Sequence, residues 1–342
     1  MVKIKRKFFS VGQALFAIEN VGDRVIAYDC GGQTKKLVSD AIWRWYHECP
    51  KREIDALFIS HYDRDHINGV FMLLGLFRIK TVYLPMVSTL SRFMSATRSH
   101  FSLGYVGFYA DPRAFLMNAG VRSVRYVGQQ DTFLAEENAT FEEGDNSDLT
   151  RNVALSFPEM PDWVYIPYNR KMMEKQEEKD FFVSLGLPDD TSVLELLNLW
   201  EKKDLNLKKA LLKIGTVTAQ TINDYSMTLY SGSLHSQNGC LFLGDYNAKA
   251  NIAEIQAVYR RVWNNITMVQ IPHHGSIYNF NVNLLISNAI HVISNKDKPY
   301  GKRQVDPSSV IREIEVNNKE ICEKTFLGDV SYCQCSRQRC RR

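Results

Sequence analysis

Four side chains of the kind that bind metal ions lie within six residues of this sequence. His61, Asp63, Asp65 and His66 directly follow the apolar run 56–59. The run predicts a short buried strand, and the alternation of the first three would place them on one side of an extended segment. Imidazole and carboxylate together suit Zn²⁺, Mn²⁺ or Fe. A chance cluster of solvated turn residues is the weaker interpretation of so dense a set.

Two further apolar runs end in the same kind of residue. The run 240–244 leads to Asp245, and the run 268–272 leads to His273 and His274. Ligands at strand ends are held by a rigid scaffold while the following loop stays open to substrate. We therefore expect three distant stretches of chain to meet around a pair of cations.

Size and composition set broad limits on the class of protein. The 342 residues fit one large domain with an insertion, or two domains, and the 45% hydrophobic share is ordinary for a globular chain. The net charge of +4 is too small to indicate nucleic-acid binding by itself. We expect no membrane span and no secretory signal, since no long apolar run is present. Seven cysteines without such a signal predict reduced thiols and a cytoplasmic protein.

Strands and helices alternate in both halves of the chain. A hairpin is expected at 7–18 and 24–29, a helix at 35–47, and strands at 54–60 and 81–85. Residues 131–150 are acidic with no basic residue, which predicts a solvated loop or a lid. Two helices at about 170–185 and 191–213 have the character of an insertion, and strands return at 226–230, 240–244, 268–271 and 290–294. This rhythm indicates an α/β sandwich of two similar halves.

The motifs around these strands resemble those of the metallo-β-lactamase superfamily. Its signature H-x-H-x-D-H reads H-x-D-x-D-H at 61–66, a variant similar to the hydrolase domain of ComEC-type DNA-uptake proteins and its free-standing relatives. Further matches are Val11-Gly12-Gln13, Asp29-Cys30-Gly31, Leu243-Gly244-Asp245 and Pro272-His273-His274-Gly275-Ser276. The resemblance spans about 10–85 and 220–312. It implies a four-layer αββα sandwich, the metallo-β-lactamase fold, with a mainly helical insertion.

The resemblance also implies a division of the chain. Residues 1–128 and 220–312 would form the hydrolase domain, and 129–219 would form an acidic loop with a helical insertion. Residues 313–342 would be a Cys/Arg-rich C-terminal extension. The cysteine spacing there matches no common zinc finger, so free thiols are favoured over a structural zinc site.

A ligand set for two divalent ions, zinc or manganese, follows from the resemblance. His61 and Asp63 would hold the first ion, and Asp65 and His66 the second. Asp245 would bridge both. The shortage of histidines at the first site also allows Mn²⁺ or Mg²⁺ there, because carboxylate oxygens are harder ligands.

Other residues are expected to support the ions or the reaction. His273 or His274 would complete the second site, and the other would face the substrate or pack; we assign His273 as the ligand and His274, with Asp65, to catalysis. Asp29 resembles the buried aspartate that braces the motif loop from behind the ligands. Ser276 is expected beside the substrate.

Two histidines of the family pattern are missing. One normally lies before the Gly-Asp motif, where this chain has 221–226, and the other belongs to a Y-G-H-P motif that ends here at Tyr300-Gly301. The candidates to replace them are Asn223, Asp224 and Ser226 for the first, and Lys302, Arg303 and Asp306 for the second. These departures make a non-catalytic regulatory module one of the alternatives.

The expected function is metal-dependent hydrolysis, with a metal-bound hydroxide as nucleophile, and most of all a nuclease or phosphodiesterase. Lys302 and Arg303 would contact DNA or RNA, although a solvated turn is the commoner role of such residues, and Tyr62 and Arg64 would flank the pocket mouth. Hydrolysis of a small ester, thioester or cyclic phosphate is the alternative enzyme class. Partner proteins of a defence or DNA-processing system are conceivable, and the sequence leaves the oligomeric state open.

Overall fold

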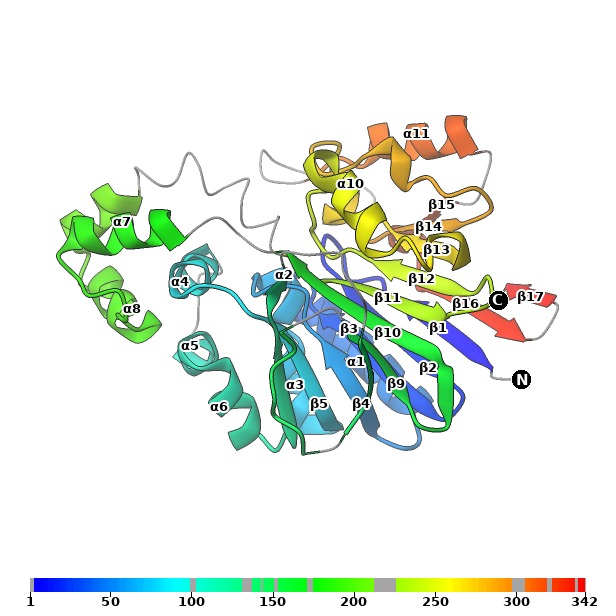
Figure 1. The fold of residues 1–342 in the computed structure, drawn as a ribbon, viewed down its shortest axis with the longest axis horizontal. Helices are drawn as coiled ribbons and strands as arrows, with labels where there is room; N and C mark the ends of the chain where they lie inside the picture. Colours follow the sequence, from blue (N-terminus) through cyan, green and yellow to red (C-terminus); the bar gives the residue numbers. More distant parts are fainter. Residues whose placement is uncertain are drawn as a thin grey trace.

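Two β-sheets face each other in the computed structural model, and helices cover both outer surfaces (Figure 1). The structure describes residues 3–98, 103–130, 137–142, 144–150, 153–170, 175–211, 226–296, 305–318, 322–335 and 338–341. Three clusters of buried apolar residues separate the layers, one between the sheets and one under the helices on either side. This is the four-layer αββα sandwich that the sequence predicted.

The first sheet has eight strands in the order β17-β16-β1-β2-β3-β4-β5-β6. Its neighbours are parallel from β3 to β6 and antiparallel elsewhere. The strands are β1 (Ile4–Phe8), β2 (Phe16–Val21), β3 (Arg24–Cys30), β4 (Glu53–Phe58), β5 (Arg78–Pro85), β6 (Ser123–Val127), β16 (Val330–Cys335) and β17 (Gln338–Arg341).

The second sheet runs in the order β15-β14-β13-β12-β11-β10-β9-β8, with the short β7 paired to β10. Neighbours from β12 to β15 are parallel, so their carboxyl ends meet at one edge. The strands are β7 (Gln129–Gln130), β8 (Glu137–Thr140), β9 (Val153–Phe157), β10 (Met160–Arg170), β11 (Thr228–Ser233), β12 (Gly239–Phe242), β13 (Ile266–Gln270), β14 (Ile290–Ile293) and β15 (Cys322–Lys324).

Helices form the two outer layers. The α-helices are α1 (Lys35–Glu48), α2 (Arg64–Ile67), α3 (Val70–Leu76), α4 (Thr89–Arg98), α5 (Leu103–Ala110), α6 (Pro112–Asn118), α7 (Lys175–Leu185), α8 (Val193–Glu201), α10 (Ala248–Val258) and α11 (Ser308–Asn318). The short 3₁₀ turns are η2 (Trp263–Asn265), η3 (His273–Gly275), η4 (Val282–Leu284) and η5 (Thr325–Leu327). Helices α1 and α3 pack on the first sheet, and α10 and α11 pack on the second. Within the described ranges, no helix has the length and apolarity needed to cross a membrane.

The central strands are buried on both faces, which explains their continuous apolar sequence. On β3, Val25 and Ala27 point toward the helices while Ile26 and Tyr28 point toward the second sheet. Successive side chains of a strand alternate between its faces, so a strand between two layers needs apolar residues at every position. Each such side chain contributes roughly 1.5–3 kcal/mol when it is fully buried.

The predicted insertion 129–219 differs from the structure in its first half. Residues 137–140, expected in a solvated loop or lid, form β8 at the edge of the second sheet, and β9 and β10 follow it. Ala139 of β8 and Leu155 and Phe157 of β9 pack into the core between the sheets. The count of acidic residues in 131–150 did not reveal the strand. Residues 131–136 lie outside the described part of the chain.

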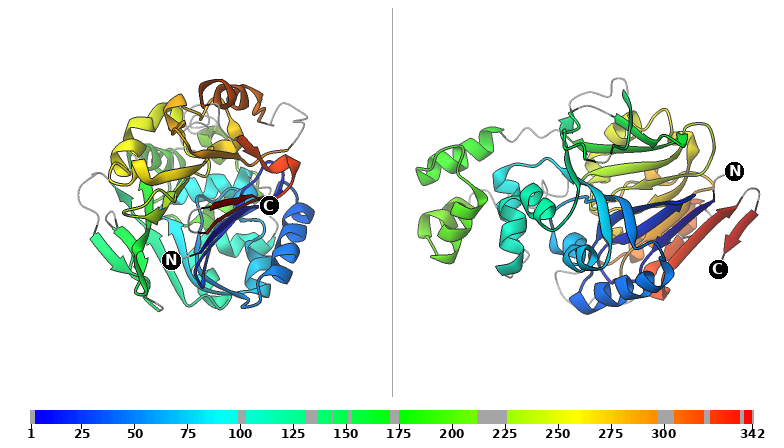
Figure 2. Two further views of the ribbon diagram at one scale, coloured as in Figure 1. Left: turned by 90° about the vertical axis from the view of Figure 1, so that its right-hand side faces the viewer. Right: turned by 90° about the horizontal axis from the view of Figure 1, so that it is seen from below.

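The helical part of this region lies beside the sandwich. Helices α7 and α8 are at the left of Figure 1 and at the left of the right-hand view of Figure 2. α8 packs against α4 and α5. The Ser192 side chain caps α8 through a reciprocal capping box with Glu195, which fixes where that helix begins.

The Cys/Arg-rich stretch also contributes to both sheets. β15 extends the second sheet beside β14, and β16 lies next to β1 in the first sheet (Figure 2). Val330 and Tyr332 of β16 pack into the core between the sheets. The question of a zinc site at Cys322, Cys335 and Cys340 concerns side chains outside the described ones.

Candidate metal centre

Side chains from three strand ends meet at one edge of the sandwich. His61 lies just beyond β4, and the short helix α2 that follows carries His66. Asp245 lies just beyond β12, and His274 belongs to η3 after β13. The three stretches singled out in the sequence therefore come together, one from the first sheet and two from the second.

The first group of ligand-type atoms consists of His61, His66 and Asp245, all buried. One atom of each lies within 4.8 Å of the other two. The His61 Nε2 is 3.8 Å from Asp245 Oδ2, and the His66 Nε2 is 3.2 Å from Asp245 Oδ1. Two imidazole nitrogens and a carboxylate that converge in one small volume are donors that suit a divalent metal ion.

A second group shares His66 and adds Asp65 and His274. The His274 Nε2 is 3.2 Å from Asp65 Oδ2 and 3.6 Å from Asp245 Oδ1. The His66 Nε2 is 4.0 Å from the same Asp65 oxygen. The two groups are therefore adjacent, with His66 common to both and Asp245 next to both.

Hydrogen bonds on the far side of the imidazoles aim their Nε2 atoms into the centre. The His66 Nδ1 is 2.7 Å from Asp29 Oδ2, and the His274 Nδ1 is 3.1 Å from the Ser294 carbonyl oxygen. An Nδ1–H donated to a carboxylate or carbonyl fixes the tautomer that leaves the Nε2 lone pair available to a cation. Asp29 thus lies behind His66, in the position expected for a brace of the motif loop.

His273 occupies a more peripheral place than its neighbour. Its Nε2 is 3.7 Å from Asp245 Oδ2, and its Nδ1 is 2.7 Å from Asn279 Oδ1. Its side chain is 25% exposed, whereas that of His274 is 2% exposed. The sequence analysis assigned His273 as the ligand and His274 to catalysis. Among the described residues the structure instead groups His274 with Asp65 and His66, and it leaves His273 beside Asp245 only.

Several ligand-type atoms in this centre are buried without a hydrogen-bond partner in the described structure. They are His61 Nε2, His66 Nε2 and Asp245 Oδ1. The 3.2 Å approach of His66 Nε2 to Asp245 Oδ1 lacks the direction of a hydrogen bond, so proximity does not satisfy either atom. Orphaned buried polar atoms are costly, and a shared cation would satisfy all three at once. The residues present therefore fit a divalent metal ion.

The electrostatics of the centre reflect close packing of opposite charges. Burial works to lower the pKa of His66, but the Asp245 and Asp29 carboxylates outweigh it and raise that pKa well above its usual value. Burial and the neighbouring His66 lower the pKa of His61. Burial would raise the pKa of Asp65, yet the hydrogen bond from His274 and the charge of His66 bring it to about 2. Burial would also raise the pKa of Asp245, but the charges of His274 and His66 lower it well below its usual value, so both aspartates of the centre are held as carboxylates.

Glycine is needed where the loops approach each other most closely. A Cβ on Gly31 would lie 1.7 Å from the backbone oxygen of Asp65, and one on Gly244 would lie 2.5 Å from Ser226 Oγ. Left-handed backbone at Asp29, with φ 53°, and at His274, with φ 56°, adds local strain. Such strained residues persist where surrounding structure holds them, and they gather at functional sites.

Other predicted site residues lie in varied places. The Asp63 carboxylate accepts a hydrogen bond from Ser95 at 2.8 Å and belongs to neither ligand group among the described residues. The Ser226 hydroxyl accepts from the Asp245 N–H at 2.9 Å and lies 3.3 Å from His61 Nδ1, behind the ligands. Ser276 is buried after η3. The predictions for Asn223, Asp224, Lys302 and Arg303 concern residues outside the described part of the chain.

Two supporting residues were missed by the sequence reading. The Ser60 hydroxyl donates to Asp29 Oδ2 at 2.7 Å and lies 2.9 Å from His61 Nδ1, so it links the brace to a ligand. The Gln270 side-chain oxygen accepts the N–H groups of Leu243 and Gly244, both at 2.7 Å. A glutamine inside the otherwise apolar strand β13 was a signal that could have been used. Ser60 offered only its position before His61.

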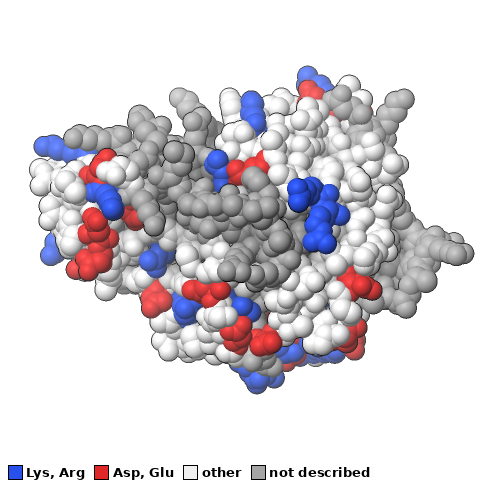
Figure 3. All heavy atoms as spheres, viewed as in Figure 1, with Lys and Arg blue, Asp and Glu red and all other residues white. Residues whose placement is uncertain are grey.

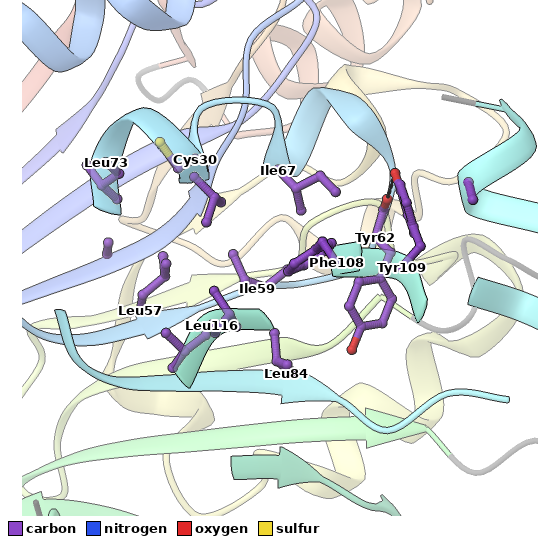
Figure 4. Packing of buried hydrophobic residues seen from close by; sticks show 14 of the residues in the cluster. Cys30, Leu57, Ile59, Tyr62, Ile67, Leu73, Leu84, Phe108, Tyr109 and Leu116 are labelled. Carbon is purple, nitrogen blue, oxygen red and sulfur yellow. Dashed lines mark hydrogen bonds between the residues drawn. The ribbon is translucent and has the colours of Figure 1, made fainter. Parts of the chain in front are cut away.

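Tyr62 was expected at the pocket mouth, and this prediction is wrong. Its ring packs among Ile59, Phe108 and other apolar side chains and is 2% exposed (Figure 4). Its hydroxyl donates to the Pro85 carbonyl at 3.0 Å, while Tyr109 donates to the Tyr62 carbonyl at 2.9 Å. The Tyr62 side chain thus points into the helical layer and not toward a pocket.

Comparisons with known proteins give structural neighbours only. No protein-family model matches the chain, and no protein of curated function matches it. Among solved structures, the metallo-β-lactamase fold protein YhfI from Bacillus subtilis is 8% identical with a TM-score of 0.46, and the match covers 98% of this chain and 100% of that one. A diphosphatase of the PhnP family is 9% identical with a TM-score of 0.36, covering 94% and 86%. A long form RNase Z from yeast is 10% identical with a TM-score of 0.36, covering 96% and 41%.

Proposed function

We propose that this chain is a metal-dependent hydrolase that cleaves phosphodiesters, and in its leading form a nuclease. One observation carries the proposal. Two adjacent groups of histidines and aspartates share His66, and three of their inward atoms, His61 Nε2, His66 Nε2 and Asp245 Oδ1, lack protein partners among the described residues. Zinc is the first expectation for the ions and manganese the second, given the mixed nitrogen and oxygen donors.

The side chains of the centre would bind two separate cations. His61 and Asp245 would hold one cation, and Asp65 and His274 would hold the other. His66 would complete one of the two sites, because its Nδ1 is engaged by Asp29 and its Nε2 has a single lone pair to offer. When bound, divalent ions supply Lewis-acid charge that activates water and offsets negative charge on the oxygens of the scissile group.

Asp65 is the residue of the centre best placed to meet substrate. Its side chain is 33% exposed while that of His66 is fully buried, so it lies on the open side. Its depressed pKa keeps it ionised at neutral pH, and an ionised carboxylate only accepts hydrogen bonds. We infer that Asp65 orients the attacking water, while Asp29 and the Ser294 carbonyl hold the Nδ1 protons of His66 and His274.

The choice of phosphodiesters rests on the H-x-D-x-D-H motif and its resemblance to ComEC-type hydrolase domains. Surface charge adds little. On the face shown in Figure 3, basic and acidic side chains are scattered in small groups of both signs. A small ester, thioester or cyclic phosphate remains the alternative substrate class, because one metal core can serve several hydrolytic reactions.

One observation favours a weakened, regulatory module as the second candidate. The Asp63 carboxylate is engaged by Ser95 and joins neither ligand group among the described residues. The first group then has three protein ligands and no additional histidine. Fewer than one tightly bound ion per chain would support this candidate.

Metal quantification on chain purified without chelator, followed by a nuclease assay on the same sample, tests the proposal. We expect about two ions per chain and cleavage of DNA or RNA that chelator abolishes. Asp65→Ala should lower the rate by about 100-fold or more, in the range for loss of a key electrostatic group. Asp63→Asn is the matched control, since it should retain both ions. Full metal content without cleavage of any phosphodiester would contradict the proposal.

A further inference from the structure

An exposed aromatic side chain lies next to the metal centre. Tyr278 is 80% exposed, although Ser276, Asn279 and Phe280 around it are 5%, 6% and 5% exposed. It follows the candidate ligands of η3 by only a few residues. Single exposed hydrophobic residues are common on proteins, so exposure alone assigns no role.

The backbone that carries Tyr278 is fixed to the centre by hydrogen bonds. Its N–H donates to Ser276 Oγ at 3.3 Å, and the next N–H, that of Asn279, donates to the Ser276 carbonyl at 3.0 Å. The Asn279 side chain then lies 2.7 Å from His273 Nδ1 and donates to the Asp245 carbonyl at 3.2 Å. Tyr278 therefore stands on a turn whose position is set by the ligand loops themselves.

A lysine accompanies the ring. Lys249 lies in the first turn of α10, shortly after Asp245, and is exposed. Its N–H donates to the Asn279 carbonyl at 3.0 Å, and its Nζ donates to the Ile277 carbonyl at 3.5 Å. The Nζ is 6.0 Å from the centroid of the Tyr278 ring. An aromatic ring and a cation thus lie near each other on the turn that follows the candidate ligands.

We propose that Tyr278 stacks on a base of a single-stranded nucleic acid whose neighbouring phosphodiester enters the metal centre, and that Lys249 contacts the backbone phosphate. This inference rests on the proposed function and narrows its substrate class. Every base has a π-face, so a rigid aromatic ring binds bases with little sequence preference, and a lysine supplies the charge that phosphates require. In a duplex those faces are stacked on one another, so a strand with free bases is the better ligand.

Steady-state kinetics of the metal-loaded chain test the proposal with three substrates. They are a single-stranded oligonucleotide, its duplex, and methyl p-nitrophenyl phosphate, which has a phosphodiester but no base. Tyr278→Ala should raise KM for the single strand by about five- to a hundredfold, as expected for loss of one stacked base, with kcat little changed. KM for methyl p-nitrophenyl phosphate should stay the same.

Controls separate stacking from damage to the fold. Tyr278→Phe keeps the ring and should behave as the wild type. Val282→Ala alters another side chain of the same segment, 49% exposed, and should change neither KM. Lys249→Ala should raise KM for the single strand and flatten its dependence on salt, since one phosphate contact is lost. An unchanged KM in Tyr278→Ala, or an equal rise with the small phosphodiester, would overturn the inference.

Binding distinguishes failure of this inference from failure of the proposed function. Fluorescence anisotropy with a labelled, cleavage-resistant phosphorothioate single strand needs no catalysis. Weaker binding by Tyr278→Ala in a chain that cleaves nothing would sink the hydrolase proposal and keep the stacking site. Cleavage of methyl p-nitrophenyl phosphate by a chain that binds single and double strands equally would keep the hydrolase proposal and contradict the stacking site.

Discussion

Single residues control how closely the loops of the centre can approach. Gly31 lies at the end of β3, and a side chain there would occupy the space of the Asp65 carbonyl. The Leu15 N–H also donates to that carbonyl at 3.2 Å, so the loop has no room to move away without losing a contact. The geometry of the centre therefore requires a glycine at position 31 as well as the ligand residues.

Gly31→Ala should therefore displace the 61–66 loop. We expect the variant to lose most of its bound metal and to unfold at a lower temperature than the wild type, measured by metal analysis and thermal denaturation. Gly75→Ala is the control. It lies in α3 with nothing within 4 Å of an added Cβ, so it should be neutral or stabilising by up to about 1 kcal/mol. Normal metal content in Gly31→Ala would contradict this account of the loop.

His291 should make the stability of the chain depend on pH. It is fully buried on β14, and neither ring nitrogen has a hydrogen-bond partner among the described residues. Burial lowers the pKa of His291 to about 4, below the usual value of about 6.5 in an unfolded chain. The folded state thus keeps the ring neutral while the unfolded state takes up a proton. The contribution to stability is complete above pH 6.5 and is lost as the pH falls toward 4, by about 3 kcal/mol.

Replacing the ring isolates this effect. His291→Leu removes the titrating group from both states, so its free energy of unfolding should fall less steeply between pH 6.5 and pH 4 than that of the wild type. Urea denaturation at a series of pH values measures the difference between the two chains. Parallel curves would show that His291 is protonated in the folded state or is not buried.

At the scale of elements, β1 and β2 carry a buried ion pair between the sheets. Arg6 and Glu19 face each other in the strand register, with side chains 1% and 2% exposed, and Arg6 Nε is 2.5 Å from Glu19 Oε2. Ser231 of β11 contacts both, through its carbonyl with Arg6 and through its hydroxyl with Glu19. The pair thus connects the two sheets through two polar contacts inside an apolar layer.

Replacing one residue of the Arg6–Glu19 pair should lower the free energy of unfolding far more than replacing both. Glu19→Gln leaves the Arg6 charge buried without its counterion, and we expect a loss of about 3–5 kcal/mol in the free energy of unfolding. Arg6→Met with Glu19→Leu should recover most of that loss. The exposed pair Lys36–Asp40 on α1 is the control, since Asp40→Asn should cost about 0.5 kcal/mol or less. A double variant with a lower free energy of unfolding than Glu19→Gln would contradict this expectation.

The elements differ in how well their sequence revealed them. β4 and β13 have parallel neighbours on both sides, and β12 has one. The continuous apolar runs of these buried strands predicted both the strand and the ligand at its end. β8 was missed because it lies within a stretch that was assigned as a loop on its acidic composition, and β16 was missed because its cysteines and charges suggested a tail. Within the site, His61, His66 and Asp245 were predictable by residue type. The Asp63–Ser95 contact was not, since it depends on where α4 packs.

At the scale of the whole molecule, the centre joins the two halves of the sandwich. His61 and His66 extend from the first sheet, while Asp245 and His274 extend from the second. A cation held by both sets would bind the folded chain and not the unfolded one, so it should add stability by mass action.

Chelation should therefore lower the melting temperature as well as the activity. At a free metal concentration about 100 times the dissociation constant, bound ions would contribute about 2.7 kcal/mol per site. Differential scanning calorimetry with and without chelator measures the change, and Asp245→Asn is the comparison because it should reduce the response to metal. Equal melting temperatures in both conditions would argue against ions that connect the sheets.

The pairing of β1 with β16 has a consequence for how the chain reaches this structure. Ile4 lies opposite Gln334, so almost the entire described chain must be traversed between the two partners. Contacts so distant along the sequence form late, because closing a long loop costs conformational entropy before any interaction offsets it. Until then β1 presents an unprotected edge to other nascent molecules, and refolding yield should fall as protein concentration rises.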